Sequence, residues 1–253
     1  MSAGIPTSKD GTPYDYNLQM PAFESASTNF RNQHRLSILA DADALVAGEL
    51  TFIQGRCRHI IRNNAVASAA RDKFVTSLGT IQIRWQEDGT GETHSVMQKL
   101  WDKFVENPSV DGKGDFNTMQ ATWNGDRFES GEAISRLLIV KGAGTVPLKL
   151  QNIESEYLDA AYFGQGTDVV GRTRYGITFD AATKLKPESY NFFKERTFGV
   201  YPESGDTLSR IAVPASNILH CFERKRSNQW RGIPVLSPCL IPLYELEDLA
   251  TAT

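Results

Sequence analysis

The sequence predicts an α+β fold in which several helices precede a long β section and a last helix follows it. Apolar residues recur at helical spacing up to about residue 123. From Gly131 onward, short β-branched runs alternate with Gly, Pro, Asp and Ser. Leucines at helical spacing return near the end of the chain. Helices and strands that are segregated along the chain favour α+β over a doubly wound sheet.

The chain is predicted to begin with an arm. Residues 1–30 are rich in Gly, Ser, Thr, Pro and Asp, a composition typical of flexible segments. Residues 31–253 are then predicted to form one α+β domain. Within it, residues 35–78 have helical spacing with a break at Asn63-Asn64, because asparagine favours turns and caps the following helix. Gly79 is a helix terminator.

The middle of the chain predicts one strand and two further helices. Apolar and polar residues alternate in Ile81–Trp85, which indicates a strand, and residues 87–91 indicate a turn after it. Ser95–Val105 has an apolar stripe at helical spacing, and Asp115 opens another helix that runs through Trp123.

Short strands are predicted throughout the β section, and a helix after it. The predicted strands are Ile134–Val140, Val146–Leu150, Arg174–Phe179, Tyr190–Phe193, Phe198–Tyr201, Ile211–Val213 and Ile218–Phe222. The final helix, Leu236–Ala250, meets no capping residue before residue 253. We therefore expect the helix, and the protein, to continue beyond this point.

Composition narrows the class of protein. With 253 residues, of which 40% are apolar and 23% charged, the chain can bury a sizeable core. No stretch reaches the roughly 20 consecutive apolar residues of a membrane helix, so no membrane association is expected. The net charge of −3 lacks the basic excess of proteins that grip DNA along its backbone. Three cysteines without C-x-x-C spacing argue against a disulfide framework and a zinc ribbon.

Motif searches predict no catalytic residue, no metal and no cofactor. His220 and Cys221 are adjacent, but neighbours on a strand point to opposite faces and cannot form a nucleophile–base pair. Residues 111–115 lack the ligand spacing of a calcium loop, and residues 142–144 lack the third glycine of a dinucleotide fingerprint. Neither a phosphate-binding loop nor a G-x-S-x-G nucleophile elbow occurs. We expect that the protein is not an enzyme.

Two basic clusters are the remaining candidates for a functional site. Arginine with a neighbouring aromatic can stack on nucleic acid, and Trp230 lies beside the second cluster. Arginine is also enriched at protein interfaces, where it pairs with carboxylates. Because the chain has no basic excess, we favour a subunit interface. The predicted interface residues are Arg56, Arg58, Arg62, Arg71, Arg226 and Arg231.

The segments around these clusters resemble the lambda-type portal proteins of bacteriophages. Residues 56–65 resemble the family's arginine-rich helix and its Arg-Asn-Asn segment. Residues 75–81 resemble the element that follows, with Leu78 in place of a glycine. Further similar segments are residues 115–120 and Ser130-Gly131-Glu132-Ala133, residues 148–158 with Glu156 for an aspartate, residues 175–180, the Ile-x-His strand of residues 213–222, and the Arg-x-x-Gln-x-Arg-Gly run of residues 226–232.

This resemblance implies a structural subunit of a dodecameric ring at one capsid vertex, assembled in the host cytoplasm. Such a ring contacts the major capsid protein, docks the terminase and later holds head-completion or adaptor proteins. Double-stranded DNA passes through its channel during packaging and ejection, without sequence specificity. The resemblance also implies that residues 31–253 are mainly the family's wing, with stem, clip and crown largely beyond residue 253.

Three other functions remain open from the sequence. A different head–tail adaptor of the virion would share the ring but not these motifs. A cytosolic hydrolase could use Cys221 with a distant histidine, and its thiol would then react rapidly near neutral pH. A nucleic-acid-binding module would show strongly salt-dependent affinity for DNA.

Overall fold

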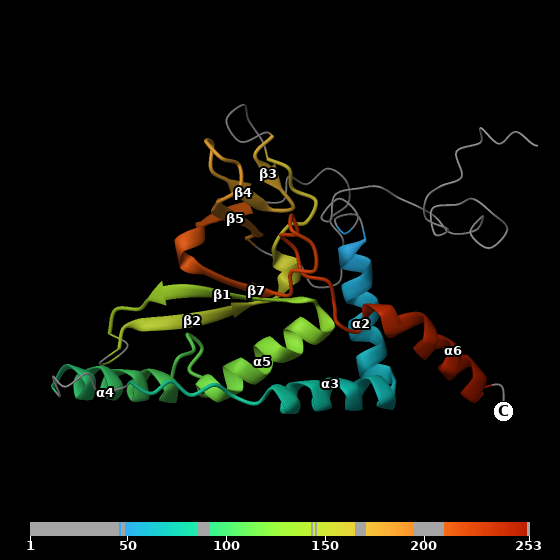
Figure 1. Cartoon of the computed structure of the whole chain (residues 1–253), viewed down its shortest axis with the longest axis horizontal. Coiled ribbons are helices and arrows are strands. Elements are labelled where there is room, and N and C mark those ends of the chain that lie inside the picture. The colour runs from blue at the N-terminus through green and yellow to red at the C-terminus, as the bar shows by residue number, and fades with distance from the viewer. Residues whose placement is uncertain are drawn as a thin grey trace, which may run out of the picture. The chain divides into compact units, whose positions relative to one another are not determined.

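The computed structural model describes residues 46, 49–85, 92–142, 144, 146–164, 171–194 and 210–251. The predicted arm, residues 35–45 of the predicted helical region, the turn at residues 87–91 and the predicted strand Phe198–Tyr201 lie outside this part of the chain. The helices are α2 (Leu50–Asn63), α3 (Ala65–Leu78), α4 (Glu92–Glu106), α5 (Phe116–Glu129) and α6 (Leu240–Thr251) (Figure 1). None of the described helices is long and apolar enough to cross a bilayer.

The strands form two antiparallel sheets. The first contains β1 (Glu132–Ile139), β2 (Leu148–Ile153) and β7 (Ile218–Phe222) in the order β2-β1-β7. The second has the order β3-β4-β5-β6, and its strands are β3 (Thr173–Arg174), β4 (Ile177–Phe179), β5 (Pro187–Phe193) and β6 (Arg210–Pro214). The α+β prediction, with helices before and after the β section, is confirmed.

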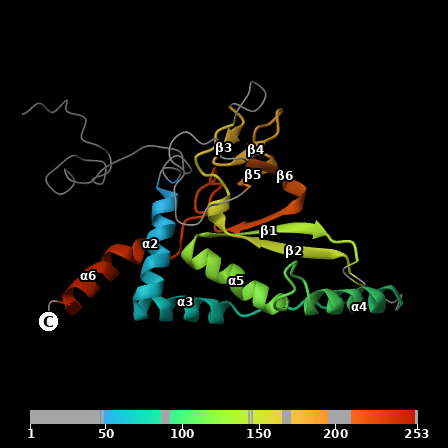
Figure 2. The same ribbon diagram turned by 180° about the vertical axis from the view of Figure 1, so that it is seen from behind.

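The two sheets enclose the main core. In both views, α5 lies on one side of the β1–β2 pair and the second sheet lies on the other (Figures 1 and 2). Ile134 of β1 and Ile218 of β7 pack there against residues of the second sheet. On the opposite face, Leu150 packs against Phe104 of α4 and Met119 of α5. The β1–β2–β7 sheet is therefore covered on both faces.

The predicted helix break at Asn63-Asn64 is confirmed. Asn64 leaves helical geometry, with φ −116° and ψ 119°, and its Oδ1 accepts hydrogen bonds from the N–H groups of Val66 and Ala67. These bonds satisfy N–H groups at the start of α3 that have no partner within the helix. Gly79 ends α3 at φ 60°, as predicted. Asp115 caps α5 in the same way through the Thr118 N–H, at 2.8 Å.

The predicted strand Ile81–Trp85 is wrong. The structure shows these residues outside both sheets. Side-chain amides hold the segment instead: Gln120 accepts from the Ile81 N–H at 2.8 Å and donates to the Ile81 carbonyl at 3.2 Å, and Gln98 accepts from the Trp85 N–H. Alternating apolar and polar residues are compatible with an extended segment, but a strand also needs a hydrogen-bonded neighbouring strand. Among the described residues, Ile81–Trp85 have no such neighbour.

The single strand predicted for Arg174–Phe179 is also a different structure. These residues form a β-hairpin of β3 and β4 whose two-residue loop is Tyr175 and Gly176, at φ 57° and 82°. Positive φ at both central residues is what such a turn requires, and tyrosine rarely supplies it. The last predicted helix is confirmed, with a short 3-10 turn at Ser237–Cys239 before α6.

Candidate functional site

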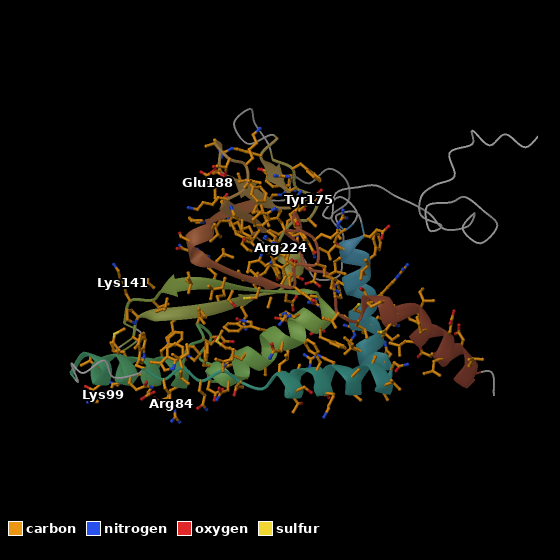
Figure 3. All side chains as sticks on the ribbon, viewed as in Figure 1. Arg84, Lys99, Lys141, Tyr175, Glu188 and Arg224 are labelled. Carbon is orange, nitrogen blue, oxygen red and sulfur yellow. The ribbon has the colours of Figure 1, made fainter. Side chains whose placement is uncertain are left out.

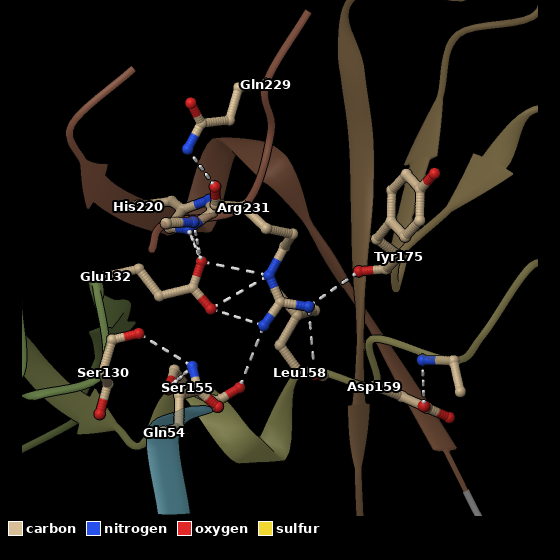
Figure 4. Close-up of polar contacts among 12 residues, drawn as sticks. Gln54, Ser130, Glu132, Ser155, Leu158, Asp159, Tyr175, His220, Gln229 and Arg231 are labelled. Carbon is tan, nitrogen blue, oxygen red and sulfur yellow. Dashed lines mark hydrogen bonds and ion pairs between the residues drawn. The ribbon is translucent and has the colours of Figure 1, made fainter. Parts of the chain in front are cut away.

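In the core, the carboxylate of Glu132, the first residue of β1, accepts hydrogen bonds from Arg231, Gly232 and His220 (Figure 4). Its side chain has no exposed surface. Arg231 donates to both carboxylate oxygens from Nε, at 3.0 and 3.1 Å, and to Oε1 from Nη2, at 2.5 Å. The Gly232 N–H and His220 Nε2 donate to Oε2, at 2.9 and 3.1 Å. Every acceptor position of this buried charge is therefore engaged.

Two glycines make this contact possible. Gly131, at φ +87°, joins α5 to β1, and Gly232 follows Arg231. A Cβ on Gly131 would overlap the backbone of Ile233, and a Cβ on Gly232 would overlap the carbonyl of Gly131. The two backbones thus touch where side chains would separate them. This close approach places the Arg231 guanidinium beside Glu132.

Arg231 also contacts backbone carbonyl groups of the β3–β4 hairpin and of the segment around the Ser155–Tyr157 turn. Its Nη1 donates to the Tyr175 carbonyl at 3.1 Å and lies 3.5 Å from the Leu158 carbonyl, while Nη2 lies 3.5 Å from the Ser155 carbonyl. Gln229 donates to the Arg231 carbonyl and accepts from the Lys225 N–H, which closes the preceding turn. The guanidinium therefore ties the β3–β4 hairpin and the Ser155–Tyr157 turn to the start of β1.

Helix α2 joins the same network through its inner face. Gln54, which is buried, donates to the Ser130 carbonyl at 2.9 Å and to Ser155 Oγ at 3.0 Å. Arg58 donates to Ser130 Oγ at 2.9 Å and pairs with Glu156 at 2.5 Å. We call the set Gln54, Ser130, Glu132, Ser155, His220, Gln229 and Arg231 the buried hub.

The electrostatics of the hub are those of a structural ion pair. Burial alone would raise the pKa of Glu132, but Arg231 and the hydrogen bond from His220 outweigh it and lower the pKa to about 2. Burial, together with the Glu132 charge, raises the pKa of the nearby Tyr190 to about 12. A carboxylate that is fully bonded and closed to solvent is poorly suited to accept a proton from a substrate.

Asp126 of α5 is shifted in the opposite direction. Its burial raises its pKa, the charge of Glu129 adds to this, and the result is about 7 despite the proximity of Arg58. Burial and the same glutamate raise the pKa of the Cys57 thiol to about 12. Cys57 of α2 packs in an apolar cluster that also contains residues of α6, and we call this cluster the α2–α6 core. Its thiol is therefore a packed apolar group and not a reactive thiolate.

The structure places the six predicted interface arginines in different environments. Arg231 is 2% exposed and serves the hub. Arg58 is part-buried against Glu156, and Arg71 lies 3.5 Å from Glu129. Arg56 and Arg62 are exposed on α2, and Arg226 is exposed with its N–H 3.3 Å from Gln229 Oε1. As a set the six stay a prediction, and Arg56, Arg62 and Arg226 are the three that are classed as exposed.

The cysteine–histidine pair is separated, as the strand geometry predicts. The His220 side chain is 4% exposed and points to Glu132, while Cys221 is exposed. Among the described residues, no group of three His, Cys, Asp or Glu side chains could hold a metal ion. The second basic cluster is also engaged internally, since Arg224 stacks on Trp230 at 4.8 Å.

Sequence reasoning missed most of the hub because its partners are far apart in the chain. Glu132 and Arg231 are separated by 99 residues, and neither belongs to a local motif with chemical meaning. One signal was present. A glutamate begins an apolar strand directly after a glycine, and an arginine directly precedes another glycine. Buried charges are retained where they are paired, so a buried glutamate at this position requires a basic partner, but the sequence does not indicate which one.

Comparison with known families gives the class of protein. The family model described as "Phage portal protein, lambda family" matches residues 30–253. The chain therefore belongs to the lambda family of phage portal proteins, which is a family of structural proteins. A search of curated proteins finds no match. Five of the segments that resemble the family, residues 130–133, 148–158, 175–180, 213–222 and 226–232, contribute residues to the hub or its contacts.

Proposed function

We propose that the chain is a subunit of a portal ring at one vertex of a phage capsid. The ring would form the channel through which double-stranded DNA is packaged and ejected. It would contact the major capsid protein, dock the terminase and later hold head-completion proteins. The observation that carries this proposal is the family match over residues 30–253.

The structure supports a mechanical role for the described residues. A ring that holds a capsid vertex while DNA moves through it needs subunits that do not deform. The hub supplies this rigidity, because one guanidinium binds the β1 carboxylate and backbone carbonyls beside the second sheet. Gln54 and Arg58 extend the same network to α2. The bonded groups are oriented toward each other and not toward a surface cleft.

The charge of the chain is consistent with DNA that slides and is not gripped. Affinity for the DNA backbone comes from neutralising phosphates, and the chain carries a net charge of −3. We expect weak DNA binding without sequence preference. A tight complex whose affinity falls steeply with salt would favour the nucleic-acid-binding alternative.

Native mass spectrometry of the full chain, combined with electron microscopy of the same sample, tests the proposal. The expected result is a closed ring of identical subunits, dodecameric as the family resemblance implies. A chain that remains monomeric or dimeric at micromolar concentration would contradict it. Labelling of Cys221 with a thiol reagent in the same preparation tests the hydrolase alternative, which requires rapid reaction near neutral pH.

A further inference from the structure

Helix α2 has a row of exposed residues that includes two arginines and a histidine. Its exposed residues recur at spacings of three and four, so they share one side of the helix. The buried residues Leu50, Gln54, Cys57 and Ile60 lie on the other side. We call the exposed set the α2 stripe: Phe52, Gly55, Arg56, His59, Arg62 and Asn63. No acidic residue occurs within α2, although Glu49 directly precedes it.

One member of the α2 stripe is a glycine, Gly55. Gly55 lies in the interior of α2, where glycine destabilises a helix by roughly 0.5–1 kcal/mol relative to alanine. A Cβ on Gly55 would meet no atom within 4 Å. Close packing against the described residues therefore does not require a glycine at this position. Arg56 follows Gly55 directly, Arg62 lies about two turns further on nearly in line with it, and Phe52 lies about one turn before it, 63% exposed.

Helix α6 carries a surface of the opposite charge. It contains Glu245, Glu247 and Asp248 and no lysine or arginine. Its inner residues Leu240, Leu243 and Tyr244 pack in the α2–α6 core. Its outer side exposes large apolar residues beside the acidic ones. These are Ile241 at 63%, Leu246 at 50% and Leu249 at 67% exposure.

We propose that α6 of one copy of this chain packs on the α2 stripe of the next copy. The two surfaces match in charge and each adds exposed apolar side chains, so contact would pair arginines with carboxylates and bury Phe52, Ile241 and Leu249. Gly55 lets the neighbouring helix approach the α2 backbone. Because the two surfaces differ and lie on the same chain, their contact is head-to-tail, which is the kind that closes into rings. This inference rests on the proposed function and names its subunit contact.

Charge exchange between the two surfaces tests the contact in the full chain. One variant carries Arg56→Glu with Arg62→Glu, a second carries Glu245→Arg with Asp248→Arg, and a third combines all four substitutions. Each of the first two should raise the subunit concentration needed for half-assembly by about tenfold or more, because like charges then face each other. The combined variant should regain assembly. Lys141→Glu, in the turn between β1 and β2, is the matched control that should assemble normally (Figure 3).

The glycine gives a second, independent test. Gly55→Trp fills space that is open in the subunit but occupied in the proposed contact, so the subunit should fold and fail to assemble. Gly55→Ala is the matched small substitution and should impair assembly far less. A melting temperature close to that of the unaltered subunit verifies folding for each variant.

The outcomes separate this inference from the proposed function. If the unaltered chain forms rings and both charge-reversed variants form them equally well, the α6–α2 contact is wrong and the portal assignment stands. Additive losses in the combined variant would also contradict the contact. If the unaltered chain forms no ring, the proposed function itself fails. Recovery of rings in the combined variant supports both.

Discussion

Arg231 and Arg56 are the same residue type in two opposite environments. Arg231 is closed to solvent and bound to Glu132 and to backbone carbonyls, whereas Arg56 lies exposed on the α2 stripe. The sequence suggests one role for both, at a subunit interface. The fold gives them different environments. The close approach of the Gly131 and Gly232 backbones places Arg231 in the core, whereas Arg56 lies on the side of α2 opposite its buried residues. Arginines must therefore be sorted by what they contact before a role is assigned.

The largest expected effect distinguishes the buried pair from a surface pair. Glu132→Gln removes the charge that neutralises Arg231 and should lower the free energy of unfolding of the unassembled subunit by about 3–5 kcal/mol. Glu188→Gln is the matched control, since Glu188 is exposed and pairs with Arg172; it should cost about 0–1 kcal/mol. Urea unfolding followed by circular dichroism measures both. Equal losses would mean that the hub contributes no more than a surface ion pair.

The two shifted carboxyls should give opposite dependences of stability on pH. The pKa of Glu132 is lowered to about 2, so its contribution, on the order of 3 kcal/mol, is present above pH 4.5 and is lost as the pH falls toward 2. The pKa of Asp126 is raised to about 7, so its contribution is present below pH 4 and is lost as the pH rises through 7.

Free energies of unfolding of the subunit, measured at intervals of about one pH unit between about pH 2.5 and 8, test this pair of predictions. Asp126→Asn should remove the decline between pH 4 and 7 and leave the acid limb. Glu132→Gln should remove the acid limb instead. A decline between pH 4 and 7 that persists in Asp126→Asn would show that another group is responsible.

Alanine substitutions at two glycines should change subunit stability in opposite directions in the core and on the α2 stripe. Gly131→Ala places a side chain at φ +87° against the backbone of Ile233 and should lower subunit stability by about 2–3 kcal/mol. Gly55→Ala meets no atom and should raise it by about 0.5–1 kcal/mol. Thermal unfolding of the two variants side by side measures the difference. A loss at Gly55 similar to that at Gly131 would mean that α2 is packed on its outer side within the subunit.

The smallest expected effect on stability belongs to the stripe itself. Arg56→Glu should change the free energy of unfolding of the unassembled subunit by less than about 0.5 kcal/mol, because surface substitutions away from special contacts have small effects. A strong loss of subunit stability in Arg56→Glu would place that arginine in the fold and not in assembly.

Local signals in the sequence predicted those parts of the fold that depend on neighbours in the chain. Asn64 and Asp115 cap their helices by accepting hydrogen bonds from N–H groups two or three residues away, so the helix boundaries were predictable. The β3–β4 hairpin was not, because Tyr175 adopts a left-handed conformation that its residue type disfavours. The segment Ile81–Trp85 has the pattern of a strand, but its contacts come from glutamines on α4 and α5.

The candidate site was less predictable for the same physical reason. The motifs that resemble the portal family contain Glu132, His220 and Arg231, yet their spacing does not reveal that they meet. Their contact depends on the crossing of two glycine-containing backbones far apart in the sequence. A pairwise signal between distant positions is needed to predict such a hub, and a single chain does not provide it.

Hydrogen–deuterium exchange of the unassembled subunit and of the assembled ring tests the central distinction most directly. We expect that peptides covering residues 130–136, 155–158 and 229–233 are strongly protected in the subunit and change little on assembly, because the hub is internal. Peptides from α6 and from α2 should gain protection only in the ring. Rapid exchange at residues 130–136 in the subunit, or no gain on α6 in the ring, would contradict the division between a buried arginine for folding and exposed arginines for assembly.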